Sequence, residues 1–140
     1  MNKDPFGNLQ EWGTVIDKLI DLEQAGKLSD CQAGLVRILR FKGNWRLREV
    51  VLKSIGKIKT TEVELTDDVL HIIIDDNTYY EARIMACEAL QHIIKQNHHG
   101  QKSFTVFPRR HFSEQLTLLR NTPQPPIFSD AIDRCLQDLQ

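Results

Sequence analysis

Long apolar runs, paired cysteines and phosphate-binding glycine motifs are all missing from this chain of 140 residues. No apolar run approaches the ~18 residues that a membrane span needs, and residues 1–13 contain no apolar segment of the kind found in secretory signals. The three cysteines include no C-x-x-C pair, which argues against a disulfide framework or a zinc knuckle. These absences predict a cytoplasmic protein without a membrane partner.

Signatures of catalysis and of cofactor binding are missing as well. Neither G-x-x-x-x-G-K-S/T nor G-x-G-x-x-G occurs among the seven glycines. His98 and His99 are adjacent, and adjacent side chains do not converge on a metal as helical residues four apart do. Cys31 lies near a predicted helix N-terminus, where a thiol pKa is lowered, but no histidine can be assigned as its base. We predict a non-catalytic protein with no metal site and no cofactor.

What the chain does contain is typical of a globular helical domain. Hydrophobic residues make up 41% and charged residues 26%, and the length suits a single domain over residues 1–140. Apolar residues recur at three- and four-residue steps nearly throughout, and only Ser103–Phe107 has the composition of a strand. We predict helices over 8–25, 30–41, 44–59, 66–76, 78–97, 113–121 and 129–139. Their expected N-caps are Asp30, Asn44, Thr66, Thr78, Ser113 and Ser129.

An internal repeat organises these helices into pairs. A shift of 35 residues superimposes identical residues without a gap: Leu35 on Leu70, Ile38 on Ile73, Arg48 on Arg83 and Ile58 on Ile93. Because one pair of antiparallel helices cannot cover its own apolar face, such units are expected to stack on one another. We predict clear units over about 30–62 and 63–97, a degenerate third unit over 113–140, and a first helix that caps the other end.

The second helix of each unit, over 47–58 and 82–93, resembles the HEAT-repeat pattern. That family has an arginine near the start of its second helix, small residues midway and a leucine or isoleucine toward the end. The matching residues here are Arg83, Ala86, Ala89, Leu90 and Ile93. The resemblance implies an all-α fold of the α-α superhelix type, a short HEAT-like solenoid of about three helical pairs with an N-terminal capping helix. It specifies architecture far better than function.

Charge is segregated along the chain, although the net charge is only −1. Residues 37–59 carry a net charge of +7, and residues 62–88 carry −7. On the predicted helix over 44–59, the cations Arg46, Lys53 and Lys57 lie opposite the apolar face, so we expect them to be exposed. In HEAT-like stacks this helix lines the concave surface, where the three cations would meet an acidic protein segment or a phosphate backbone.

A structural interpretation of the same charges stays open beside the functional one. The 35-residue shift places Arg46 on Glu81 and Lys53 on Glu88, and equivalent positions on stacked helices are neighbours. Ion pairs between units would then occupy much of the basic patch, each contributing ~0.2 to 1 kcal/mol if exposed. Lys57 falls only on His92, so it has no carboxylate at the equivalent position.

Residues 98–112 form a predicted loop that is longer than connections between stacked helices usually are. Three phenylalanines and three cations alternate in it: Phe104, Phe107, Phe112, Lys102, Arg109 and Arg110. Such a mixture suits contact with a protein or stacking on bases. The alternative is that the phenylalanines cover the end of the core where the repeat breaks, because large apolar side chains are seldom left in water together.

Together these patterns favour a protein-protein interaction module, a scaffold or a regulatory subunit. It would bind a partner protein through the concave second-helix surface and the 98–112 loop, with contacts from Arg46, Lys53, Lys57, Phe107, Arg109 and Arg110. The alternative is a nucleic-acid-binding protein with a basic groove on residues 37–59. Self-association through the exposed end repeat is a further prediction.

Overall fold

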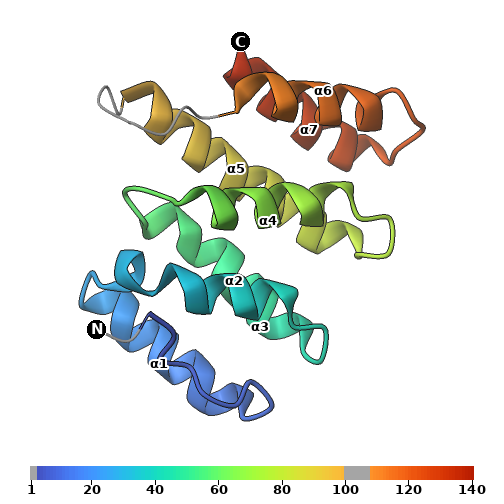
Figure 1. Ribbon diagram of the computed structural model, residues 1–140. Coiled ribbons are helices and arrows are strands. Elements are labelled where there is room, and N and C mark those ends of the chain that lie inside the picture. Colours follow the sequence, from blue (N-terminus) through green and yellow to red (C-terminus); the bar gives the residue numbers. More distant parts are fainter. Residues whose placement is uncertain (1–2, 100–107) are drawn as a thin grey trace.

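The predicted all-α class is confirmed. The computed structural model describes residues 3–99 and 108–140, and within these ranges the chain forms seven α-helices and no strand (Figure 1). They are α1 (Trp12–Gln24), α2 (Gln32–Arg40), α3 (Trp45–Ser54), α4 (Val63–Ile74), α5 (Tyr80–His99), α6 (Arg109–Arg120) and α7 (Pro126–Leu139), with two 3-10 turns, η1 (Leu28–Cys31) and η2 (Ile55–Lys57). The strand candidate Ser103–Phe107 lies outside the described residues.

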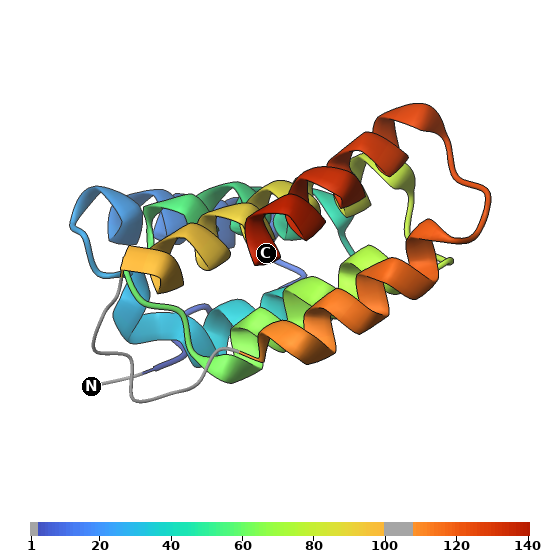
Figure 2. The ribbon, with the colours of Figure 1, turned by 90° about the horizontal axis from the view of Figure 1, so that it is seen from above.

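The helices form two layers, which are seen side by side in Figure 2. The first layer consists of α2, α4 and α6, and each of these helices packs on the next. The second layer consists of α1, α3, α5 and α7, which also contact one another in chain order. Each of the pairs α2–α3, α4–α5 and α6–α7 joins the two layers as an antiparallel hairpin. Helices of neighbouring hairpins therefore lie next to each other within a layer.

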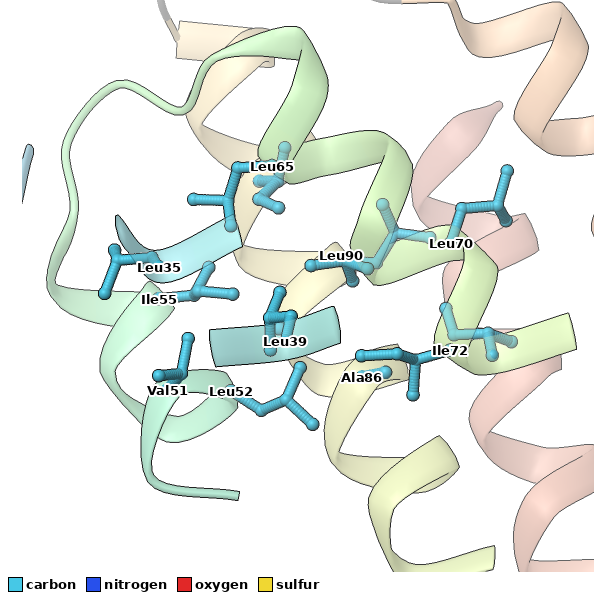
Figure 3. Packing of buried hydrophobic residues seen from close by; sticks show 14 of the residues in the cluster. Leu35, Leu39, Val51, Leu52, Ile55, Leu65, Leu70, Ile72, Ala86 and Leu90 are labelled. Atoms are coloured by element: carbon cyan, nitrogen blue, oxygen red, sulfur yellow. The ribbon is translucent and has the colours of Figure 1, made fainter. Parts of the chain in front are cut away.

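The core lies between the two layers, as the close view of Figure 3 shows. It is built from the apolar positions that the repeat superimposes, because Leu35 and Leu70 are both buried and so are Ile38 and Ile73. Ala86 is a buried residue of α5 in this core. Its small side chain allows neighbouring helices to pack close to α5. The sequence period thus identifies the core face of each helix.

Only one of the six predicted N-caps is confirmed. Asn44 precedes α3, and its side-chain oxygen accepts a hydrogen bond of 2.8 Å from the backbone N–H of Arg46. Thr66 lies inside α4, where its hydroxyl donates to the carbonyl of Glu62. Asp30, Ser113 and Ser129 also lie within helical turns, and the Thr78 hydroxyl donates to Asp75, two residues before α5 begins.

The helices around the misplaced caps begin earlier for a reason visible in the sequence. Pro126 occupies the first position of α7, where its missing N–H needs no partner and its fixed φ suits a helix. Pro108 likewise precedes α6, which begins at Arg109. Proline therefore sets these two starts, and the serines that follow are interior residues.

The sequence predicts a first helix that begins at residue 8, but α1 begins at Trp12. The residues before α1 are not helical. They form a segment that lies against α2, where the N–H of Gly34 donates to the carbonyl of Lys3 at 3.1 Å. Phe6 is buried in this contact, and Asp4 accepts hydrogen bonds from Arg37. This segment covers the side of α2 that faces away from α4.

The end of α1 has the Schellman geometry. Gly26, with φ +69°, lies just past the C-cap Ala25 and donates its N–H to the carbonyl of Glu23. The N–H of Lys27 donates to the carbonyl of Leu22 at 2.8 Å. Because the left-handed φ favours glycine, α1 stops here and the chain crosses to the first layer.

The predicted loop over 98–112 is shorter in the structure. Helix α5 continues to His99, and α6 begins at Arg109, so Arg109 and Arg110 belong to a helix. Phe112 is fully buried in α6, which agrees with the interpretation that it covers the core. Phe104 and Phe107 lie outside the described residues. Among the described helices, none has the length and apolar character that crossing a membrane requires.

Candidate functional site

The candidate site is the outward surface of α3 and α5, which we call the second-layer face. Arg46 and Lys53 on α3 and Lys57 in η2 are exposed, as predicted. Helix geometry explains this, because Leu47 and Val51 point into the core from the opposite side of α3. All three cations therefore reach solvent on one side of the molecule.

Carboxylates occupy the neighbouring helix of this face. Glu81 and Glu88 are exposed on α5, one repeat after Arg46 and Lys53. They are followed by two exposed residues near the C-terminal end of α5, His92 and Lys95. The second-layer face therefore presents a basic row on α3 beside an acidic row on α5.

The two helices run in the same direction and in register. At their N-terminal ends, the Tyr79 hydroxyl donates to Oε2 of Glu49 at 2.6 Å, and the Tyr79 ring meets Trp45 edge-on at 6.1 Å. At their C-terminal ends, a Cβ added to Gly56 would lie 3.1 Å from Nε2 of His92, so this ring packs directly on the glycine. Contacts at both ends keep α3 and α5 level along their length.

The ion pairs expected between these rows are not formed. No ion pair within 4.0 Å joins Arg46 to Glu81 or Lys53 to Glu88, and all four residues lie in the described part of the chain. The Arg46 guanidinium instead lies over the Trp45 ring, with its Cζ 5.5 Å from the ring centroid. The structural interpretation of the basic patch is therefore wrong for these two pairs.

Three half-buried apolar side chains lie between the charged positions: Val50 on α3 and Ile84 and Met85 on α5. At one edge of the face, Trp45 is 54% exposed and Tyr80 is 41% exposed. Each begins its helix. The face thus combines a partly apolar centre with charged positions, an arrangement that protein interfaces share.

The basic segment 37–59 does not form one groove. Arg37 donates to Asp4, and Arg40 pairs with Asp68 at 2.8 Å and with Glu64 at 3.3 Å in the first layer. These contacts raise the pKa of both guanidinium groups, with the hydrogen bond to the carboxylate as the main cause. Only part of the positive charge therefore reaches the second-layer face.

Arg48 and Arg83 occupy the same repeat position but have different surroundings. Arg83 is 2% exposed, and its Nε donates to the carbonyl of Ile73 at 2.9 Å. Its guanidinium packs against the rings of both Tyr80 and Phe128, 5.2 and 4.5 Å from their centroids. Arg48 is half-buried, and its Nε has no hydrogen-bond partner in the structure. Arg83 is thus a structural residue of the α5–α7 contact.

The residues predicted beyond α3 are only partly described. Arg110 is exposed on α6 and pairs with Glu114 one turn later, at 3.1 Å. Arg109 donates to the carbonyl of Leu139 at the end of α7. Arg109 and Arg110 therefore lie on α6 and not on α3 or α5, and Phe107 lies outside the described residues.

The tyrosine pair at the start of α5 was not predicted as part of this site. Burial, together with the hydrogen bond to Glu49, raises the pKa of the Tyr79 hydroxyl above its ordinary range. The signal in the sequence is weak, because a tyrosine at a predicted helix start is equally consistent with core packing. The aromatic character of Trp45 and of the residue one repeat later, Tyr80, is the only pattern that could have identified this edge.

Metal binding or thiol chemistry would depend on the histidine, cysteine and acidic side chains of the described residues. No group of three or more histidine, cysteine, aspartate or glutamate side chains in them could hold a metal ion. Cys31 is buried, and burial raises its thiol pKa, contrary to the lowering expected at a helix N-terminus. Cys87 and Cys135 are also buried, and the Cys135 thiol donates to the carbonyl of Cys87.

A shallow pocket of about 430 Å³ lies between α2 and α4 in the first layer. Charges of both signs line it, and Asp68 is already engaged by Arg40. Because these groups neutralise one another, the pocket has no preference for an anion or a cation. Its charged lining includes Lys42, Arg48, Asp67, His71 and Asp75.

Comparisons with models of protein families, with curated proteins and with solved structures found no match. The candidate site is therefore defined by this chain's own geometry. Its most informative property is the pair of adjacent, level and unpaired rows of opposite charge on α3 and α5.

Proposed function

We propose that this chain is a short HEAT-like α-solenoid that binds a partner protein through its second-layer face. Two observations support the architecture: helices 35 residues apart in the sequence lie side by side, and hairpins follow one another in two layers. The proposed binding surface belongs to the layer formed by the second helix of each hairpin. The protein would act as a non-catalytic scaffold or regulatory subunit.

The observation that carries this proposal is the exposure of Arg46, Lys53 and Lys57 without a carboxylate partner in the structure. A cation that already pairs with a carboxylate of its own chain gains little from an ion pair with a second molecule. Cations that face solvent beside half-buried apolar side chains can provide both attraction and buried area. The second-layer face has both features within two neighbouring helices.

Three further contacts with the partner protein are proposed near the start of α6. Arg109 and Arg110 lie in the first turn of α6, and Phe107 precedes that helix in the sequence. The route by which they would join the second-layer face depends on the connection between α5 and α6. We therefore give them a secondary role in partner binding.

Nucleic-acid binding is the competing outcome of the test. Arg37 and Arg40 are paired in the first layer, and the acidic row of α5 adjoins the basic row of α3. A phosphate backbone on α3 would thus meet Glu81 and Glu88 directly beside its cations, which repel it. These contacts favour a protein partner over a nucleic acid.

The test is affinity capture from a lysate of the source organism with the tagged full chain and a double reversal, Lys53→Glu with Lys57→Glu. The wild-type chain should retain a stoichiometric protein after nuclease treatment, and the double reversal should lose it. The matched control is Lys3→Glu with Lys27→Glu, which makes the same charge change at exposed positions outside the face and should retain the partner.

Two outcomes would contradict the proposal. If the double reversal captures the same protein as the wild type, the second-layer face is not the binding surface. If the wild type retains nucleic acid instead, and if that binding weakens steeply with salt at a logarithmic slope of ~0.9 per neutralised phosphate, the nucleic-acid alternative is correct.

A further inference from the structure

The charges of the second-layer face form a pattern that is complementary to itself. Arg46 and Lys53 lie on α3, and Glu81 and Glu88 lie 35 residues later on α5. All four are exposed, and no ion pair joins the two rows. A surface with equal numbers of opposite charges in two parallel rows can bind a rotated copy of itself.

The spatial register of the two rows is fixed at both ends. Tyr79 joins α5 to Glu49 near the start of α3, and His92 packs on Gly56 just after its end. The Trp45–Tyr79 ring contact and the Gly56–His92 contact join residues 34 and 36 apart, close to the 35-residue repeat, so the helices are parallel and nearly in register. Arg46 is therefore level with Glu81, and Lys53 is level with Glu88.

A two-fold rotation can bring the level charges of two copies together. A two-fold axis parallel to the helices, placed midway between α3 and α5 on the second-layer face, lays α3 of one copy over α5 of the other. Positions along the helices do not change under this rotation. Arg46 of each copy then faces Glu81 of the second copy, and Lys53 faces Glu88 of the second copy.

The apolar side chains between the charged residues suit the same two-fold contact. Val50, Ile84 and Met85 are half-buried and lie between the two charged levels. The rotation brings these apolar side chains of the two copies together at the centre, with the ion pairs around them. At one end of the same face, Trp45 and Tyr80 are partly exposed. Aromatic residues and methionine at the centre with charges outside are typical of protein interfaces.

We infer that the second-layer face binds a second copy of this chain and forms a two-fold dimer through α3 and α5. This inference rests on the proposed function, because it names the partner of the same surface. It differs from self-association through the end repeat, since its axis lies between α3 and α5 and not at α6 and α7. It also explains why the opposite charges of the two rows are free within one chain: each row is complementary to the other row of a second copy.

The test uses sedimentation of the full chain and of two row variants. The acidic variant carries Arg46→Glu with Lys53→Glu, and the basic variant carries Glu81→Lys with Glu88→Lys. The wild type should be a dimer at ~100 µM, in the range expected of a small interface. Each variant alone presents rows of one sign, so its dimer dissociation constant should rise by at least about 100-fold.

Mixing the two variants separates contact between chains from contact within a chain. An equimolar mixture should form a heterodimer, because all acidic rows then face all basic rows. Intrachain pairing of Arg46 with Glu81 cannot produce this result. If a row variant fails to fold by circular dichroism, the chain with all four substitutions replaces it, since exchanging the two rows should restore the wild-type dimer. The control Lys3→Glu with Lys27→Glu should dimerise as the wild type does.

The opposing results are distinct. A wild-type chain that stays monomeric at high concentration overturns the inference, and so does a dimer whose dissociation constant neither row variant changes. Both results leave the proposed function standing if Lys53→Glu with Lys57→Glu still abolishes capture of another protein. Failure of the proposed function would instead appear as capture that no second-layer substitution affects.

Discussion

The two layers of this protein contain similar charged side chains but use them differently. In the first layer, Arg40 of α2 reaches Asp68 and Glu64 of α4 and forms ion pairs between neighbouring hairpins. In the second layer, Arg46 and Glu81 lie on equally close neighbours and remain apart. The spacing of opposite charges in the sequence therefore does not establish whether they pair.

Side-chain direction accounts for part of this difference. Helical side chains lean toward the helix N-terminus, so Arg40 at the end of α2 reaches carboxylates that precede its repeat equivalent, Asp75. Arg46 lies in the first turn of α3 and leans toward Trp45, where its guanidinium lies over the ring. Arg46 and Glu81, which form no ion pair in the structure, are therefore left available to bind another molecule.

The strongest test of this contrast compares two arginines on the second layer. Arg83→Ala removes a buried guanidinium packed against two rings and leaves the Ile73 carbonyl without its donor, so we expect a loss of about 2 to 4 kcal/mol of unfolding free energy. Arg46→Ala should change stability by less than about 0.5 kcal/mol, because Arg46 is exposed. Urea titration followed by circular dichroism measures both, and equal effects would contradict the assignment of Arg83 as structural.

A pair of double-mutant cycles sharpens the comparison between layers. The Arg40 and Asp68 cycle should give a small favourable coupling that decreases as salt is added. The Arg46 and Glu81 cycle, measured at concentrations where the chain is monomeric, should give a coupling near zero. Similar couplings in both cycles would show that the two layers do not differ in solution.

The smallest expected effect concerns acid stability. The Arg37 guanidinium donates to Asp4 and holds the pKa of that carboxyl below its ordinary value of 3.8. The folded state then favours the charged carboxylate, so its contribution is complete above the unfolded pKa and is lost as the pH falls through the folded pKa. Asp4→Asn should remove this contribution and make stability fall less between about pH 5 and pH 2. An unchanged pH profile would mean that the pair contributes nothing.

The helical content and the core could be predicted from the sequence. The superimposed pairs Leu35 with Leu70 and Ile58 with Ile93 are buried, because a repeat of apolar positions must follow the surface that neighbouring helices share. Helix starts were harder to predict. A threonine such as Thr66 can cap a helix or lie inside it, and the sequence does not distinguish the two.

The candidate site could also be predicted only in part from the sequence. Exposure of Arg46, Lys53 and Lys57 could be predicted, because helical period alone places them opposite the apolar face. The absence of ion pairs to Glu81 and Glu88 could not, since long side chains choose among several rotamers and local partners. The Arg46 contact with the Trp45 ring is one such local choice.

Gly34 shows how one missing side chain shapes an end of the molecule. A Cβ at this position would lie 2.6 Å from the Phe6 ring, closer than side-chain atoms pack. The residue one repeat later is Val69, which is buried on α4 as an ordinary core residue. In the first hairpin the Phe6 ring therefore fills the volume that a valine side chain would occupy. A short non-helical segment packs on α2 there, whereas a helix, α2, packs on α4. An alanine at Gly34 would leave no room for that ring and open α2 to water and to proteases.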